Sequence, residues 1–386
     1  MPPEMSEVSR RLMLKCSVAA GIASVASTGW GQPGPDERVA MGAAANAFME
    51  EYDVPGLSVA IARNGSIAYA QGFGVADKDT GEKVTPDHLF RIASVSKPVT
   101  SVSIFSLLEQ GRLKLVDKVF GAGGILEPDY EVPPTKKYIK DITIGHLLTH
   151  ASGGWPNGPH DPMSANKEMN HRQLISWTLN NLPLAGRPGT KFIYSNFGYC
   201  VLGRVVEKIT RQDYAEYVRQ SVLAPCGIAA MRIAGNTLAD RVDGEVVYYH
   251  RTRDPYAKNM TRNDSTGGWL ASALDLVRFA THVDGSSQTP NILRPATIAA
   301  MTTPTVHPRY AYGWGVIGGN WWHDGILPGT TAILVLTRSG FCWAALANSS
   351  RQGSYRGIDK MVKNMVRSVK RWSHQIDVEP FRGRGE

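Results

Sequence analysis

The sequence has few cysteines, no strong excess of one charge and no repeating unit, and each of these absences excludes a class of protein. Only 4 of its 386 residues are cysteine, yet a chain of this length can bury a substantial core without disulfides or metal ions. A formal net charge of +8, with 42% hydrophobic and 20% charged residues, argues against a disordered chain and against a multi-span membrane protein. No period of about 20 to 50 residues recurs, which argues against solenoids and propellers.

The first 26 residues resemble an export signal. Arg10 and Arg11 precede a weakly apolar run, residues 16–26, that is too short to span a bilayer comfortably. Small residues at the end of this run allow cleavage before Ser27. We therefore expect a twin-arginine signal at 1–26, one folded domain at 27–386, no stable membrane span after cleavage and a periplasmic location. The alternative is a basic tail on a cytoplasmic protein.

The charged residues give no sign of a nucleic-acid partner. Basic side chains gather only near the C-terminus, where they alternate with apolar residues at helical spacing over 358–372. This pattern is typical of an amphipathic helix with a solvated basic face. The three cysteines beyond the signal, Cys200, Cys226 and Cys342, are odd in number and have apolar neighbours, which indicates buried thiols.

Strand-forming segments lie toward both ends of the chain, and helix-forming segments lie between them. Residues 57–63 and 66–72 are β-rich and are joined by Asn64-Gly65, the strongest short-range hairpin signal. A buried helix is expected from Ser94 to Gly111. Further helices are expected over 142–150, 172–180, 199–209, 214–223 and 358–372, and late antiparallel strands over 310–317, 332–336 and 341–346.

This order predicts an α+β fold. One antiparallel sheet would be assembled from the two ends of the chain and flanked by helices, with a mostly helical lobe, roughly 110–270, inserted in the middle. A cleft between these parts is the expected position of an active site.

Ser94 and Lys97 form a Ser-x-x-Lys pattern at the start of the expected central helix. Residues three apart share a helix face, so the amine can reach the hydroxyl. A serine hydroxyl is a poor nucleophile until a base takes its proton, and a lysine can do so only where burial lowers its pKa from about 10.4. The pattern recurs at Ser164 and Lys167, in what reads as a surface loop, and a simple helix-capping serine is the alternative at Ser94.

Two further motifs supply groups that acyl transfer needs. Tyr194 is the only tyrosine with an asparagine two positions on, so its phenol could relay a proton while the amide of Asn196 binds an acyl group. The third motif is His323-Asp324-Gly325-Ile326, in which glycine allows a close approach of substrate to the backbone. The N–H of Ile326 could then pair with that of Ser94 as an oxyanion hole.

Taken in this order, the three motifs resemble those of the serine β-lactamase and penicillin-binding-protein-like superfamily, from about residue 40 to 372. The class C-like branch, with D-alanyl-D-alanine carboxypeptidases and family VIII carboxylesterases, is the most similar. The resemblance implies that Ser94 is acylated, that Lys97 and Tyr194 share the acid–base work, and that Asn196 orients the substrate. It implies an ester or amide substrate, small or peptide-like, and neither a metal nor another cofactor.

The third motif departs from the Lys-Thr-Gly of true β-lactamases, because His323 stands for the lysine and Asp324 for the threonine. A histidine is neutral more often than a lysine near neutral pH, so it anchors a substrate carboxylate less reliably. We therefore expect a carboxylesterase or a D-amino-acid peptidase, with a class C-like β-lactamase as one alternative. The other alternative is not an enzyme but a sensor that binds penicillin without turning it over.

Other patterns have simpler interpretations. Residues 313–318 match G-x-G-x-x-G, but strand residues follow where a dinucleotide site needs a helix, so a strand and turn are expected. His146 and His150 lack the glutamate of a zinc-protease motif and are interpreted as structural. The absence of G-x-S-x-G argues against an α/β-hydrolase lipase.

Overall fold

The computed structural model describes residues 32–158, 161–164 and 166–373. The expected export signal at 1–26 lies outside these residues. Within them, no helix has both the length and the apolar composition that crossing a bilayer requires.

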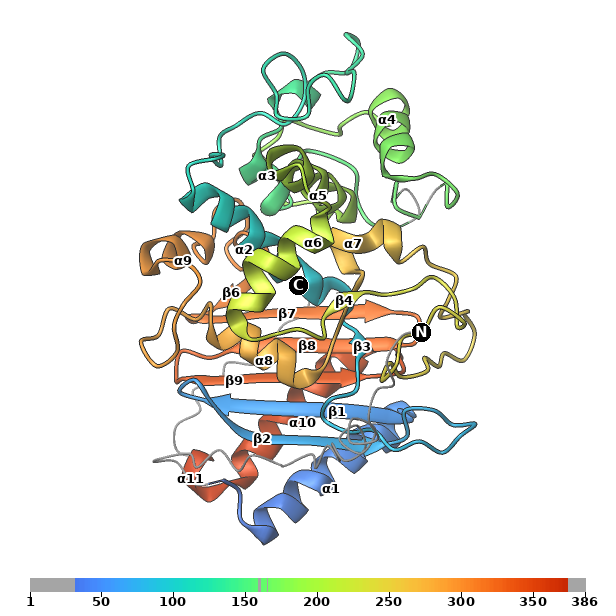
Figure 1. Cartoon of the computed structure of the whole chain (residues 1–386), viewed down its shortest axis with the longest axis vertical. Coiled ribbons are helices and arrows are strands. Elements are labelled where there is room, and N and C mark those ends of the chain that lie inside the picture. Colours follow the sequence, from blue (N-terminus) through green and yellow to red (C-terminus); the bar gives the residue numbers. More distant parts are fainter. Residues whose placement is uncertain (1–31, 159–160, 165, 374–386) are drawn as a thin grey trace, which may run out of the picture. The chain divides into compact units, whose positions relative to one another are not determined.

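A six-stranded antiparallel sheet is built from the two ends of the described chain, with strand order β2-β1-β9-β8-β7-β6 (Figure 1). The contact between the two ends is made by β1 and β9, which pair from Leu57 with Ala347 to Arg63 with Phe341. This confirms the predicted α+β fold and its sheet. The strands are β1 (Gly56–Arg63), β2 (Ser66–Gly74), β6 (Gly315–Ile317), β7 (Asn320–Leu327), β8 (Thr330–Leu336) and β9 (Phe341–Ala347).

The predicted hairpin at Asn64-Gly65 is present between β1 and β2. Both residues have positive φ, 46° and 78°, as a two-residue type I′ turn requires. Glycine adopts such a φ without a steric penalty and asparagine tolerates it well, so this dipeptide fixes where the chain reverses.

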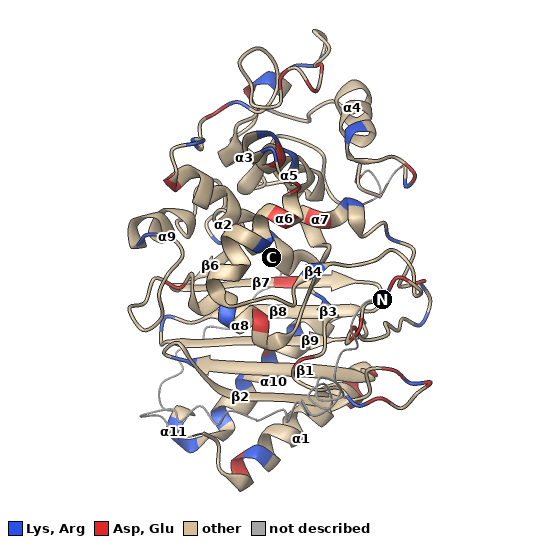
Figure 2. Ribbon diagram, viewed as in Figure 1, with Lys and Arg blue, Asp and Glu red and all other residues tan. Residues whose placement is uncertain are grey.

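Each face of the sheet is buried against helices, because successive side chains of a strand point to opposite faces. On β1, Ala60 and Ala62 belong to one hydrophobic core, and Val59 and Ile61 belong to another. The first core lies against α2 (Ser96–Glu109) and α8 (Ala273–Thr281), and the second lies against α1 (Pro35–Tyr52) and α10 (Ser354–Ser368). Strands β8 and β9 carry no charged residue at all (Figure 2), as expected of strands buried on both faces.

The helices between α2 and β5 lie partly beyond α2 from the sheet and partly beside α2 (Figure 1). They are α3 (Ile144–Leu148), α4 (His171–Asn181), α5 (Asn196–Thr210), α6 (Tyr214–Val218) and α7 (Asp264–Gly267). A single π-helical turn, Arg219–Leu223, continues α6. The two segments together form the helix that was expected over 214–223. The remaining elements are α9 (Pro295–Met301), α11 (Lys370–Ser373) and a small sheet of β3 (Phe90–Arg91), β5 (Trp269–Ala271) and β4 (Arg232–Ile233).

Several elements differ from the sequence-based expectation. The strand expected over 310–317 is reduced to β6, because Gly313 has a φ of 85° that interrupts an extended backbone. The C-terminal helix expected over 358–372 is interrupted at Val369, whose backbone is extended. Helix α1 and the small sheet were not predicted. In α1 the buried side chains are only Met41, Ala45 and Phe48, so its apolar stripe is too narrow to stand out in the sequence.

Candidate active site

Ser94 lies in a tight turn between the small sheet and the central helix. The 3₁₀ turn Ala93–Val95 follows β3, and α2 begins at Ser96, two residues later than expected. Ala93 has a φ of 49°, a left-handed conformation that costs a residue with a side chain about 1–2 kcal/mol. The turn leaves Ser94 partly exposed while Ala93 and Val95 are buried.

Lys97 is fully buried, and its amine has three hydrogen-bond acceptors around it. The Nζ atom lies 3.1 Å from Oγ of Ser94, 2.8 Å from Oδ1 of Asn196 and 2.8 Å from the main-chain oxygen of Thr266. An ammonium group donates three hydrogen bonds, so the charged form is satisfied. The neutral amine would keep its two N–H bonds to Asn196 and Thr266 and turn its lone pair toward the hydroxyl of Ser94.

The second motif lies where α5 begins. Ser195 is the N-cap, with Oγ accepting from the N–H of Gly198 at 3.2 Å, so Asn196 is the first helical residue. Tyr194 directly precedes this cap, and its ring centroid lies 5.0 Å from Nζ of Lys97. The structure therefore brings Ser94, Lys97, Tyr194 and Asn196 together, as the sequence predicted.

Gly325 lets β7 approach the turn that carries Ser94. A Cβ atom placed on Gly325 would lie 2.3 Å from the carbonyl oxygen of Ile92 and 3.1 Å from the backbone nitrogen of Ser94. Any side chain there would force the strand away from the turn. The third motif, residues 323–326, lies within β7. Ile326 follows on the exposed end of this strand.

His323 is buried in a chain of hydrogen bonds with a definite direction. The N–H of Ser195 donates to Nδ1 of His150 at 3.1 Å, so the hydrogen of the neutral His150 ring is on Nε2, which lies 3.2 Å from the hydroxyl of Tyr310. Tyr310 in turn lies 3.2 Å from Nε2 of His323. At the far end, Nδ1 of His323 donates to the carbonyl oxygen of Asp324 at 2.7 Å.

The hydroxyl of Tyr310 thus bridges the two imidazoles, between Nε2 of His150 and Nε2 of His323. The ring of His150 also lies 4.1 Å from that of Tyr194, centroid to centroid. The interpretation of His150 as structural is thus supported by its bonds, although it links the second and third motifs. His146 makes a separate bond, in which Nδ1 accepts from the N–H of Thr143.

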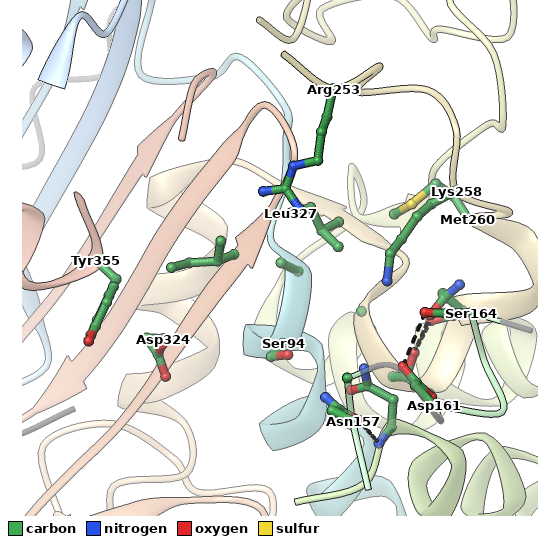
Figure 3. A pocket seen from close by; sticks show the side chains of 17 residues that line it. Ser94, Asn157, Asp161, Ser164, Arg253, Lys258, Met260, Asp324, Leu327 and Tyr355 are labelled. Atoms are coloured by element: carbon green, nitrogen blue, oxygen red, sulfur yellow. Dashed lines mark hydrogen bonds between the residues drawn. The ribbon is translucent and has the colours of Figure 1, made fainter. Parts of the chain in front are cut away.

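A cavity of about 520 Å³ opens at Ser94. Figure 3 shows Ser94 between Asp324 on one side and Asp161, Ser164 and Asn157 on the other. Ser164 is exposed on a loop, as predicted, but that loop lines the same cavity. Lys258 and Arg253 reach the cavity from a further loop (Figure 3).

Asp161 is a buried carboxyl group that supports the second motif. Burial raises its pKa, while the N–H of Met163, the side chains of Ser164 and Asn196 and the charge of Lys258 oppose the shift. Its Oδ1 accepts from the N–H of Met163 at 2.9 Å. Since Asn196 hydrogen-bonds Asp161 and accepts from Lys97, both ends of its amide are fixed.

Sequence reasoning missed Thr266, Asp161, Lys258 and Tyr310. Thr266 contributes a main-chain oxygen, for which no side-chain pattern exists. Asp161 and Lys258 lie on loops without periodicity. His150 was noticed, but nothing in its spacing from Tyr310 indicated contact. The G-x-G-x-x-G match at 313–318 forms β6 and the following turn, as expected.

Comparison with known proteins identifies the family. Residues 42–364 match the β-lactamase family. Protein flp of Staphylococcus aureus is 30% identical over 181 residues, which are 46% of this chain and 34% of that protein. Penicillin-binding protein 4* of Bacillus subtilis is 30% identical over 194 residues, which are 48% of this chain and 40% of that protein. The match thus spans well under half the length of these curated relatives.

Solved structures show the same fold at low identity. EstCE1, described as a hydrolase with promiscuous acyltransferase activity, has a TM-score of 0.71 and 19% identity over 85% of this chain and 98% of that one. The D-amino acid amidase of Ochrobactrum anthropi has a TM-score of 0.70 and 21% identity over 87% of this chain and 99% of that one.

The fold and the family match define the class, a β-lactamase and transpeptidase-like protein, as the motifs predicted. Within that class, the chain belongs to the β-lactamase family.

Proposed function

We propose that this protein hydrolyses a carboxylic ester or amide through an acyl-enzyme on Ser94, as a carboxylesterase or D-amino-acid peptidase. The observation that carries the proposal is the distance of 3.1 Å between Nζ of the buried Lys97 and Oγ of Ser94, at the floor of an open cavity. A nucleophile and a base within hydrogen-bond reach are the structural signature of covalent catalysis.

Acylation follows from this arrangement. Neutral Lys97 takes the proton of the Ser94 hydroxyl while Oγ attacks the substrate carbonyl carbon. The N–H groups of Ser94 and Ile326 bind the resulting oxyanion. When the tetrahedral intermediate collapses, the bond to the leaving group breaks, and that group takes a proton from Lys97 or Tyr194. Water then attacks the acyl-enzyme, giving its proton to the same pair, and Ser94 leaves as the hydroxyl.

The state of His323 supports an esterase or peptidase over a β-lactamase. Both of its ring nitrogens are engaged, one by Tyr310 and one by the carbonyl oxygen of Asp324. An imidazole whose two nitrogens are bound within the protein is poorly placed to bind the carboxylate of a β-lactam. Esters and amides whose binding does not need a cation on β7 are therefore the favoured substrates.

The proposal is tested by turnover of 4-nitrophenyl butyrate and nitrocefin by the wild type and by Ser94→Ala. Sustained ester turnover that disappears in the variant supports the enzyme. A single stoichiometric burst without further product would instead support a penicillin-binding sensor.

Export to the periplasm through residues 1–26 is part of the same proposal and is tested by N-terminal sequencing of the protein recovered from a periplasmic fraction.

A further inference from the structure

Lys258 places its amine at the cavity of Ser94. It lies on the loop that leads to the 3₁₀ turn Thr261–Asn263, and its amine points into the cavity (Figure 3). Among the described residues its amine makes no hydrogen bond and no salt bridge, and the carboxylate of Asp161 acts on it only through its charge. Burial lowers the pKa of Lys258, and Asp161 partly offsets this effect. A half-buried cation without a direct anionic contact is costly unless a ligand supplies one.

The neighbouring charges show what kind of ligand is missing. The carboxylate of Asp161 is already used by Met163, Ser164 and Asn196, so it is not available as a full partner for Lys258. The second cation at the cavity, Arg253, lies near His250, with 3.5 Å between its Nη2 and Nε2 of the imidazole, so it has no anion there either. Asp324 lies on the other side of Ser94 from Lys258 (Figure 3).

The third motif offers no lysine on β7 for this task. Both ring nitrogens of His323 are engaged within the protein, one by the hydroxyl of Tyr310 and one by the carbonyl oxygen of Asp324. Two basic side chains that line the cavity, Lys258 and Arg253, belong instead to one loop.

We propose that Lys258 binds a carboxylate of the substrate, so that the natural ester or amide is one that carries a negative charge close to the bond that is cleaved. This inference rests on the proposed function, because it names the substrate class of the same site. The carboxylate belongs either to the acyl group, as in a dicarboxylic acid monoester, or to the leaving group, as in a peptide with a free C-terminal carboxylate.

The test compares matched substrates that differ only in this charge. On the acyl side, mono-4-nitrophenyl glutarate is compared with 4-nitrophenyl butyrate. On the leaving-group side, an N-acyl-D-alanyl-D-alanine is compared with its C-terminal amide. We expect Lys258→Met to lower kcat/KM about tenfold to a hundredfold for the charged member of one pair, the scale of a hydrogen bond to a charged group, and to leave the neutral member within about twofold.

Two matched variants distinguish direct binding of the carboxylate by Lys258 from the general electrostatic effect of positive charges near the cavity. Lys258→Arg keeps the charge and should retain most of the preference. Lys167→Met removes an exposed lysine that contributes to the field at Lys258 but does not line the cavity, and it should leave both pairs unchanged. Equal losses for charged and neutral substrates in Lys258→Met, or an equal effect of Lys167→Met, would overturn the proposal.

A binding measurement keeps this result separate from the catalytic proposal. In the Ser94→Ala protein, calorimetric titration with N-acetyl-D-alanine, with its amide and with monomethyl glutarate requires no turnover. We expect a carboxylate to bind more tightly than the amide, and Lys258→Met to remove the difference. If wild-type turnover depends on Ser94 but carboxylates bind no better than the amide, the hydrolase stands and the anchor fails. If carboxylates bind through Lys258 but Ser94 is never acylated, the anchor stands and the hydrolase fails.

Discussion

The amine of Lys97 donates to the main-chain oxygen of Thr266 at 2.8 Å, and this bond ties the base to the C-terminal end of α7. Together with Asn196 it holds the amine so that its remaining hydrogen, or its lone pair, faces Ser94. The position of the base is therefore set by two groups that take no part in bond making. This arrangement underlies the predictions that follow.

Replacing Lys97 by alanine removes the base while leaving the nucleophile in place. We expect the rate of acylation to fall by at least about 10²-fold, the usual scale of acid–base catalysis, with the fold retained. Rapid-quench mass spectrometry of the acyl-enzyme measures the rate, and circular dichroism checks the fold. Lys191→Ala, which removes an exposed lysine of the segment before Tyr194, serves as the control and should not change the rate. Unchanged burst kinetics in Lys97→Ala would contradict the assignment.

Replacing Tyr194 by phenylalanine keeps the ring that lies 5.0 Å from the amine of Lys97 but removes the hydroxyl. If the phenol shares proton transfer, turnover should drop by about 10²-fold or more. Steady-state kcat measures this. A drop of less than about threefold would remove Tyr194 from the acid–base chemistry.

Replacing Tyr310 by phenylalanine breaks the hydrogen-bonded link between His150 and His323. Each imidazole then has a buried nitrogen without this partner, so we expect the free energy of unfolding to fall by about 1–3 kcal/mol. Urea denaturation provides the measurement. Tyr312→Phe is a matched control, since Tyr312 is only partly buried, and it should change stability by less than about 0.5 kcal/mol. Equal effects of the two variants would show that the link stabilises nothing.

Asp264 couples stability to pH. Burial by itself would raise the pKa of Asp264, but Arg204, 2.5 Å away, and His171 lower it to about 2. Because this pKa is lowered on folding, the stabilisation is fully present above about pH 4 and is lost as the pH falls through about 2. We expect the wild type to lose about 2 kcal/mol over this range through Asp264.

Asp264→Asn should lack this acid-dependent component. It should also lose about 3 kcal/mol near neutral pH, because the buried charge of Arg204 loses one of its two carboxylate partners among the described residues and keeps Glu207. Denaturant titrations at several pH values test both statements. Glu216→Gln, in an exposed pair with Arg219, is the control and should cost less than about 1 kcal/mol. An identical pH dependence in the wild type and Asp264→Asn would contradict the argument.

The local parts of the site could be predicted because their geometry is set by short-range rules. Ser94 and Lys97 lie three residues apart on one turn, and Tyr194 and Asn196 flank a helix cap, so their relative positions depend on few dihedral angles. The hairpin at Asn64-Gly65 is predictable for the same reason. Such features are encoded in residues that are neighbours in the sequence.

The remaining parts depend on contacts between distant segments. Thr266 lies 169 residues from Lys97 and acts through its backbone, so its residue type carries no signal. Tyr310 was assigned to a strand, whereas its hydroxyl lies between two histidines from different parts of the chain. The role proposed for Lys258 follows only from the position of its amine at the cavity of the folded protein. Single-sequence patterns do not contain such information.

The most direct test of the account is the position of the acyl group. Wild type, Ser94→Ala and Ser164→Ala are exposed to 4-nitrophenyl butyrate, quenched in acid and digested, and the peptides are analysed by mass spectrometry. We expect one butyryl adduct on the peptide that contains Ser94, present in Ser164→Ala and absent in Ser94→Ala. An adduct on another residue, or undiminished ester turnover by Ser94→Ala, would contradict it.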